Sequence, residues 1–348
     1  MNPYVLAGLL FSIGLGTFMT LTSSHWFLAW MGLEINTLAI IPLMTRHHHP
    51  RAVEATIKYF LVQATAASTI LFASTMNAWI TGQWDIEQMT HPIPTTIITL
   101  ALALKMGLAP LHSWFPEVLQ GLDLMTGLLM STLQKLAPFA LMLQLQINQP
   151  TLLVMLGVCS TLMGGWGGLN QTQIRKILAY SSIAHLGWMI LVMQFSPQIS
   201  LMTLLTYYIM TGCIFLILKH NKAMNINALA TSSTTNTALS ATVPLVLLSL
   251  GGLPPLTGFA PKWMILQELT KQELSTIATL TALSALLSLY FYLRLSYAIT
   301  LTIPPNTTAN TLKWRLNMSS HTTTMAILTT ATLLLLPLMP AAMALLNM

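Results

Sequence analysis

Charged residues are scarce in this chain of 348 residues, of which only 6% are Asp, Glu, Lys or Arg. Soluble proteins carry about 25% charged residues, so this composition excludes a water-soluble globular domain. Apolar residues make up 54% of the chain, which is the composition of a polytopic membrane protein. Cysteine is also scarce, and Cys159 and Cys213 both lie in apolar stretches. Two such thiols provide neither a disulfide framework nor an iron–sulfur cluster, which needs about four ligands.

Several motifs are missing as well. No glycine-rich motif lies between a strand and a helix, which argues against a nucleotide site. Basic residues in the loops are too sparse for nucleic acid, and they fit the negative side of a membrane with its anionic lipid. The first apolar stretch starts at Met1-Asn-Pro without a basic segment, so we expect no cleavable signal peptide. Adjacent helical residues point apart, so His47, His48 and His49 are not expected to bind a metal.

Long apolar runs are abundant, and a membrane-spanning helix needs about 20 mostly apolar residues. The sequence predicts an all-α polytopic membrane protein with about eleven transmembrane helices in a single domain, residues 1–348. The predicted spans are 3–21, 24–45, 57–79, 95–118, 123–143, 150–168, 174–194, 200–218, 240–270, 275–297 and 323–346.

Basic residues fall mostly on one side of this predicted arrangement. If the N-terminus is on side one, the connections on side two hold only Lys271. Such asymmetry indicates that side one is the side on which positive loops are retained. It also places the C-terminus on side two. The nine basic residues of the side-one connections are Arg46, Arg51, Lys58, Arg175, Lys176, Lys219, Lys222, Lys313 and Arg315.

The fourth predicted span contains an unusual segment, 105–117, with the sequence KMGLAPLHSWFPE. It places Lys105 in an apolar environment and follows it with Gly107 and two prolines. A lysine deep in a membrane is costly, and proline removes a helical hydrogen bond. Such a segment persists only where the freed backbone lines a protein-buried or hydrated cavity. Broken helices of this kind mark the ion or substrate path of transporters.

A second copy of this segment occurs in the ninth predicted span, where GLPPL at 252–256 repeats GLAPL at 107–111. Two Pro/Gly turns can look alike by chance, but here the likeness continues through an aromatic residue and a second proline. The fourth and ninth spans run in opposite directions, which predicts an inverted repeat with the pathway near the membrane midplane. We assign the two units to 24–168 and to 174–346, the latter including the C-terminal helix.

Away from the ends of the predicted spans, four Asp, Glu, Lys or Arg residues remain inside them, namely Glu34, Lys105, Lys135 and Lys262. Burial disfavours the charged form of such groups, and a neighbouring opposite charge restores it. Their protonation can therefore change when a partner moves, as a proton relay requires. The alternative is that Glu34 and one lysine form a static pair that only orients helices. One glutamate, however, cannot neutralise three lysines, and ionisable residues inside a membrane are functional by default.

Two histidines are further candidates. His112 lies inside the first motif, and His185 lies in the seventh predicted span beside Ser181 and Ser182, which suggest a polar seam. Imidazole titrates near neutral pH, so either could carry a proton between lysines. Either could equally be a hydrogen-bonded histidine of the core.

The motifs LEINTLAIIPLM, KMGLAPLHSWFPEV, RKILAYSSIAHLGW and GGLPPLTGFAPKW resemble the chain-2 family of antiporter-like subunits in the membrane arm of respiratory complex I, NADH:ubiquinone oxidoreductase. The resemblance covers the whole chain and is greatest to the mitochondrially encoded vertebrate type. It implies an antiporter-like fold with a shortened N-terminus and two discontinuous helices. It also implies that Glu34, Lys105, Lys135 and Lys262 form the proton relay. Some relatives have a glutamate where Lys262 stands.

The resemblance further implies an H⁺-translocating NADH:ubiquinone reductase in which this chain holds no cofactor. NADH, FMN, the iron–sulfur clusters and ubiquinone would belong to other subunits. Implied partners are the other membrane-arm and accessory subunits and membrane lipids, including cardiolipin, but no nucleic acid. The implied location is the mitochondrial inner membrane, with the N-terminus in the matrix and the C-terminus in the intermembrane space. Two rival interpretations are a stand-alone secondary cation/proton antiporter and a purely structural scaffold.

Overall fold

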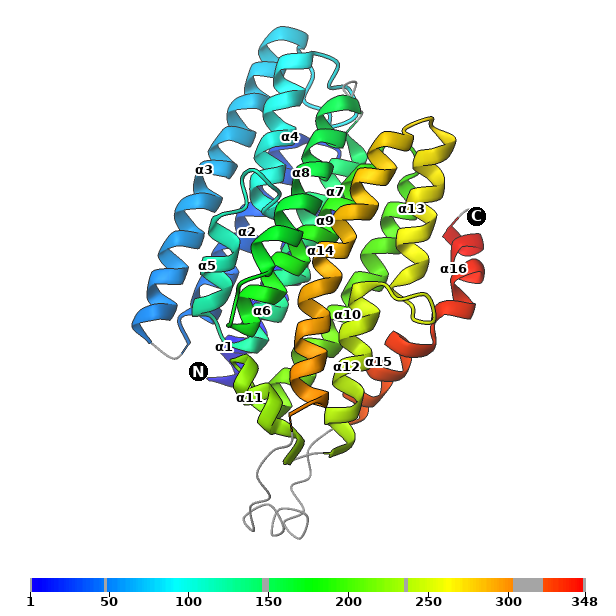
Figure 1. The fold of residues 1–348 in the computed structure, drawn as a ribbon. Helices are drawn as coiled ribbons and strands as arrows, with labels where there is room; N and C mark the ends of the chain where they lie inside the picture. Colours follow the sequence, from blue (N-terminus) through cyan, green and yellow to red (C-terminus); the bar gives the residue numbers. More distant parts are fainter. Residues whose placement is uncertain (1, 47–48, 146–149, 235–236, 303–321, 347–348) are drawn as a thin grey trace. The chain divides into compact units, whose positions relative to one another are not determined.

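The computed structural model describes residues 2–46, 49–145, 150–234, 237–302 and 322–346 (Figure 1). The chain divides into two compact units, Met1–Ser160 and Thr161–Met348. Regular structure in the described ranges is helical, apart from two isolated β-bridges, and this confirms the predicted all-α class. Lys313, Arg315, His47 and His48 lie outside the described residues, and the predicted orientation stays a prediction.

The first unit is built mainly from helices that begin at proline or after a polar capping residue. Proline suits the first helical position because its missing N–H would have no partner there. The side chains of Asn2 and His49 accept hydrogen bonds from the backbone N–H groups of Tyr4 and Arg51. The helices are α1 (Pro3–Thr22), α2 (Trp26–Met44), α3 (Pro50–Thr81), α4 (Pro92–Met106), α5 (Trp114–Gly121), α6 (Leu124–Ser131), α7 (Leu133–Gln144) and the start of α8 (Pro150–Gly168).

The second unit contains the rest of α8 and a further set of helices, two of which are short 3₁₀ turns. Its elements are α9 (Ile174–Met193), α10 (Pro197–Asn221), α11 (Ile226–Ala230), η1 (Thr231–Thr234), α12 (Thr237–Gly251), α13 (Phe259–Lys271), α14 (Ser275–Thr300), α15 (Thr323–Leu334), η3 (Leu336–Leu338) and α16 (Met339–Leu346).

Seven of the described helices are long and apolar enough to cross a membrane, namely α1, α2, α3, α8, α9, α10 and α14. The pair α15 and α16, bent by 69°, makes an eighth if it is one span. The remaining three predicted spans, 95–118, 123–143 and 240–270, are each divided between two shorter helices. The structure therefore supports a polytopic membrane protein with seven or eight spans in the described part, and the count of eleven stays a prediction.

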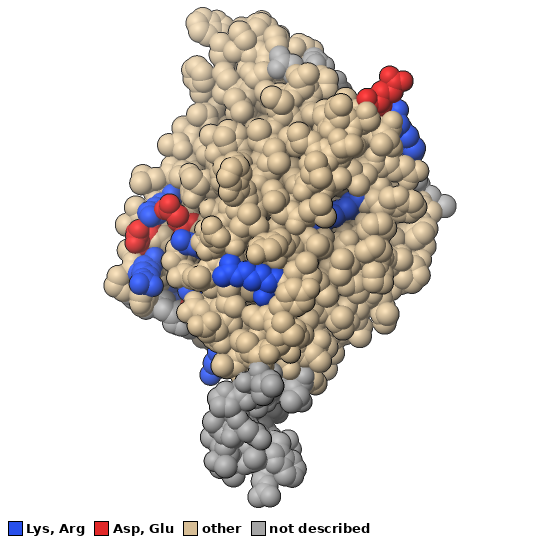
Figure 2. Space-filling view, in the orientation of Figure 1, with Lys and Arg blue, Asp and Glu red and all other residues tan. Residues whose placement is uncertain are grey.

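The surface of the described helices is suited to a membrane. Large apolar side chains point outward, including those of Phe11, Phe18, Trp79 and Trp166. Figure 2 shows a face with few charged side chains and wide uncharged areas between them. Where helices meet, small residues allow close approach. A Cβ at Gly32 of α2 would lie 2.9 Å from the carbonyl oxygen of Gly16 in α1, so α1 and α2 pack backbone to backbone.

Candidate functional site

The first predicted break is present between α4 and α5, across residues 107–113. Gly107 ends α4 with a φ of +77°, a left-handed conformation that glycine adopts without steric cost. The N–H groups of Gly107 and Leu108 both donate to the carbonyl of Ala103, at 3.0 Å each. These hydrogen bonds give a carbonyl at the end of α4 its partners, and they turn the chain out of the helix. The indole N–H of Trp114, the first residue of α5, donates to Leu104 of α4 at 3.1 Å.

The second predicted break is present between α12 and α13, across residues 252–258 (Figure 1). Gly252 has a φ of +82°, and the N–H groups of Gly252 and Leu253 both donate to the carbonyl of Leu248. Each of these residues lies 145 positions after its counterpart in the first break. The repeated sequence motif therefore produces the same helix ending twice, once in each unit.

Lys105 lies in the last turn of α4, directly before the first break. Its side chain is buried, and among the described residues its ammonium has no hydrogen-bond partner. The backbone carbonyl of Lys105 accepts a hydrogen bond of 3.3 Å from the Gln63 side chain on α3. The negative end of a helix dipole favours a cation in this position.

Glu34 of α2 is the acidic residue that attracts Lys105 electrostatically. The Thr37 hydroxyl donates to Oε2 of Glu34 at 3.1 Å, and the glutamate is only partly buried. Glu34 and Lys105 nevertheless form no direct ion pair in the described structure. The geometry thus differs from a static salt bridge, and it leaves the strength of the interaction dependent on small movements of either side chain.

Lys135 lies in the first turn of α7 and is 2% exposed. Its ammonium is 4.4 Å from the centroid of the Phe115 ring, which belongs to α5. The neighbouring Gln134 donates to the carbonyl of Asn36 at 3.2 Å and accepts from the Tyr59 hydroxyl at 3.5 Å. The helix that carries Lys135 is therefore tied to both α2 and α3.

Lys262 lies in the first turn of α13, directly after the second break. Its Nζ donates to the carbonyl oxygen of Gly251, the last residue of α12, at 2.8 Å. This bond satisfies one of the carbonyls that every helix end leaves without an internal partner. Lys105 and Lys262 thus lie beside equivalent breaks. Lys105 is in the last turn of the half-helix before its break, and Lys262 is in the first turn of the half-helix after its break.

The two candidate histidines have different surroundings. His112 lies within the first break, is half-buried, and is hydrogen-bonded to the carbonyl of Pro110. His185 of α9 stacks obliquely against Tyr207, with ring centroids 5.6 Å apart. His185 and Lys262 both line a cavity of about 20 Å³, together with Thr203 and Thr206. A cavity of this volume has room for one water molecule.

The first unit therefore contains Glu34, Lys105, His112 and Lys135, and the second unit contains His185 and Lys262 on one cavity. The sequence analysis did not predict the polar and aromatic neighbours of the lysines, namely Tyr59, Gln63, Phe115 and Gln134. The two glutamines could have been found in the sequence as polar residues within apolar spans. Phe115 gave no such signal. No group of three or more His, Cys, Asp or Glu that could hold a metal occurs within the described ranges, and both cysteines are free thiols.

Family models match nearly the whole chain. Residues 23–288 match the membrane region of the NADH:quinone oxidoreductase/Mrp antiporter family, and residues 289–343 match the C-terminus of NADH dehydrogenase subunit 2. The chain is 68% identical over 347 residues to NADH-ubiquinone oxidoreductase chain 2 of Tetraodon nigroviridis, covering 100% of both chains. It is 64% identical over 350 residues to the same chain of Salmo salar, again with full coverage.

Solved structures show the same fold. A chain of respiratory complex I from Thermus thermophilus with bound aureothin superposes with a TM-score of 0.85 at 29% identity, over 97% of this chain and 78% of that one. A chain of the Mrp complex from Dietzia sp. DQ12-45-1b superposes with a TM-score of 0.81 at 17% identity, over 97% of this chain and 77% of that one. Matching breaks, buried lysines and full-length relatives lead to one conclusion: the chain belongs to the NADH:quinone oxidoreductase/Mrp antiporter family.

Proposed function

We propose that this chain is a core membrane-arm subunit of respiratory complex I that carries protons across the mitochondrial inner membrane. The observation that carries the proposal is a lysine beside each of two matching helix breaks, in a chain 64–68% identical over its full length to chain 2 of this enzyme. A stand-alone antiporter is less well supported, because the chain shares only its fold with the Mrp chain, to which it is 17% identical.

The proposed relay begins at Glu34 and Lys105, whose attraction without direct contact suits a switchable pair. When the pair loosens, Lys105 releases a proton towards Lys135, with His112 as a further carrier. Lys262 and His185, which share one cavity, then exchange protons with side two. Each pair of half-helices forms one span in this proposal, so the described helices and breaks make eleven crossings. The units 24–168 and 174–346 are the two halves of an inverted repeat.

The energy for this transport comes from outside the chain. Moving one charge across a membrane costs about 2.3 kcal/mol per 100 mV. Electron transfer from NADH to ubiquinone, with its FMN and iron–sulfur clusters, takes place in other subunits of the enzyme. Those subunits and the surrounding lipids, including cardiolipin, are the proposed partners. The N-terminus is on the matrix side and the C-terminus is on the side of the intermembrane space.

The test is Lys105→Met in the assembled enzyme in sealed vesicles, with NADH-driven proton uptake measured per assembled enzyme. We expect a loss of pumping of roughly 100-fold, the order that a proton-transfer group contributes. Lys271→Met is the matched control, because Lys271 is an exposed lysine with 61% of its side chain accessible. Undiminished pumping in Lys105→Met, with assembly unchanged, would remove Lys105 from the pathway and leave the scaffold interpretation.

A further inference from the structure

The first turn of α5 contains two residues with contacts in different directions. Phe115 faces the buried Lys135, and Glu117 forms an ion pair with Lys58 of α3. We infer that Phe115 is a positioning residue for Lys135, and that the Glu117–Lys58 ion pair fixes α5 where this contact is made. The inference rests on the proposed function, in which Lys135 accepts and releases protons.

The contact between Phe115 and Lys135 is suited to a proton carrier. The face of an aromatic ring attracts an ammonium group, and the attraction grows as both groups leave water. Phe115 is 1% exposed and Lys135 is 2% exposed, so the contact is desolvated. A carboxylate partner would bind the ammonium far more strongly and would itself accept its proton. A phenyl ring does neither, so it holds the protonated lysine in place and still allows it to release its proton.

The position of the Phe115 ring is fixed by the helix break. A Cβ at Gly107 would lie 3.3 Å from the Cβ of Phe115, so the chain at the end of α4 packs directly on this residue. The Trp114 ring meets the Phe115 ring edge to face, with centroids 5.4 Å apart. Trp114 is in turn bonded to Leu104 of α4. The ring that contacts Lys135 is therefore part of the structure that shapes the break beside Lys105.

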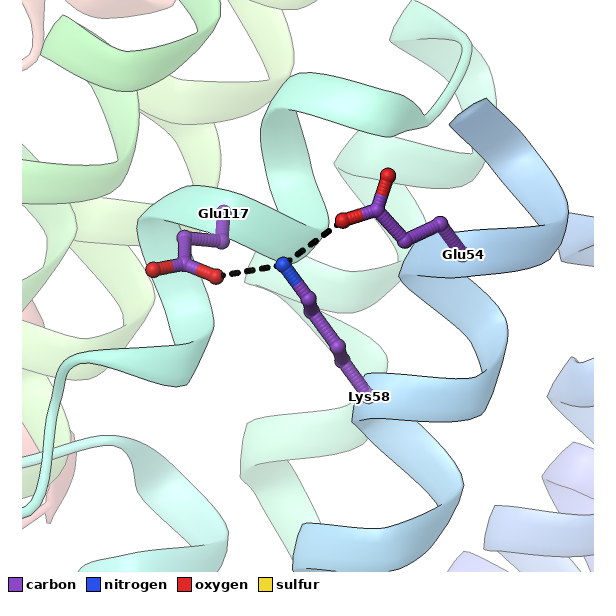
Figure 3. Close-up of polar contacts among 3 residues, drawn as sticks. All are labelled: Glu54, Lys58 and Glu117. Atoms are coloured by element: carbon purple, nitrogen blue, oxygen red, sulfur yellow. Dashed lines mark hydrogen bonds and ion pairs between the residues drawn. The ribbon is translucent and has the colours of Figure 1, made fainter. Parts of the chain in front are cut away.

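The outer side of α5 is held by α3, as Figure 3 shows. The Lys58 ammonium lies 2.8 Å from Oε2 of Glu117 and 2.8 Å from Oε1 of Glu54. At the other end of α5, a Cβ on Gly121 would lie 2.7 Å from both the Cβ of Ala55 and the carbonyl oxygen of Arg51. The short helix is thus attached to α3 at its first and its last turn. A shift of Glu117 would carry Phe115, two residues away, with it.

Among the residues that the structure describes, the second break has no equivalent of this aromatic contact. The residue 145 positions after Phe115 is Ala260, and Lys262 instead bonds directly to a backbone carbonyl. The aromatic contact is therefore a property of the first unit and not a by-product of the shared backbone motif.

The experiment compares Phe115→Leu, which keeps an apolar side chain but removes the ring face, with Phe115→Tyr, which keeps the ring. Phe215→Leu is the control, because Phe215 of α10 is equally buried. Proton uptake and quinone reduction are measured per assembled enzyme in sealed vesicles. We expect Phe115→Leu to slow pumping about tenfold. Phe115→Tyr should pump within about twofold of the wild-type rate, and Phe215→Leu should have little effect. Equal impairment of Phe115→Leu and Phe115→Tyr, or none in either, would overturn the inference.

If Phe115→Leu does not assemble, fluorinated phenylalanines at position 115 provide the second measurement. Fluorine withdraws electron density from the ring face with little change in shape, so pumping should fall with each added fluorine. An unchanged rate across the series would overturn the inference. Lys135→Met separates the two claims. Normal pumping in Lys135→Met would remove the proposed role of Lys135, whereas a loss there combined with normal Phe115→Leu would remove only the role of Phe115.

The ion pair is tested with Glu117→Gln against Glu54→Gln. Both changes remove one carboxylate charge beside Lys58, but only the first lies on α5. We expect Glu117→Gln to slow pumping roughly two- to fivefold, in keeping with the modest strength of exposed ion pairs, and Glu54→Gln to have no effect. Equal behaviour of the two variants would show that the Glu117–Lys58 ion pair does not position α5.

Discussion

The two helix breaks share a backbone but not a charge arrangement. Gly107 and Gly252 end their helices with the same left-handed turn and the same pair of hydrogen bonds. The lysines, by contrast, do not occupy equivalent positions. Leu250 stands at the counterpart of Lys105, and Glu117 stands at the counterpart of Lys262. The glycine and proline motif thus specifies the helix end, and the lysine beside it can belong to either half-helix.

The two ammonium groups also differ in how they are held. Lys262 donates directly to the carbonyl of Gly251, whereas Lys105 is attracted by Glu34 over a longer distance. A direct hydrogen bond to a fixed backbone atom changes little unless the helices move. An attraction between two flexible side chains responds to smaller shifts. We infer that the first break is the more responsive of the two, and three sets of substitutions test that comparison.

The largest effect is expected from Lys105→Arg and Lys262→Arg. Arginine keeps the positive charge and can donate to a helix end, but it does not release its proton in proteins. Both variants should assemble normally and lose pumping by roughly 100-fold. Proton uptake and the amount of assembled enzyme are the two measurements. If Lys262→Arg pumps normally while Lys262→Met fails, Lys262 acts as a structural cap and only the first break carries a proton.

A smaller effect is expected from Glu34→Gln, which removes the charge that attracts Lys105 and keeps the shape of the side chain. The Thr37 hydroxyl can still donate to the amide oxygen, so α2 should be unaffected. We expect pumping to slow about tenfold, equivalent to about 1.4 kcal/mol. Glu87→Gln is the control, since Glu87 is an exposed acidic residue of the same unit. Equal pumping in the two variants would mean that Lys105 works without its acidic partner.

The sequence predicted those features that depend on local chemistry. Glycine at 107 and 252, followed by prolines, marked the two segments in which the breaks lie. The division between α6 and α7 was not predicted, because Ser131 and Thr132 carry no helix-breaking signal. Pro138, which does carry one, lies inside α7 without ending it.

The sequence pattern could not predict the side-chain contacts that depend on tertiary packing. The Phe115 ring lies over Lys135 because the fold brings these two residues of α5 and α7 together, and nothing in the segment WFPE identifies this partner. The bond from Lys262 back to Gly251 depends in the same way on how the chain turns between 252 and 258. Intramembrane charge identified the candidate lysines, but only the fold shows what each one contacts.

The smallest effects are expected from alanine at the two glycines. A left-handed conformation costs a non-glycine residue roughly 1–2 kcal/mol, so Gly107→Ala and Gly252→Ala should lower thermal stability by similar amounts. Gly82→Ala is the control for this strain, because Gly82 has a φ of +73° and no atom within 4 Å of an added Cβ. Beyond the strain, an added Cβ at Gly252 would lie 3.0 Å from Nζ of Lys262. Because Gly252→Ala displaces that ammonium, it should slow pumping about twofold more than Gly82→Ala does. Equal pumping in the two variants would show that Lys262 tolerates the shift.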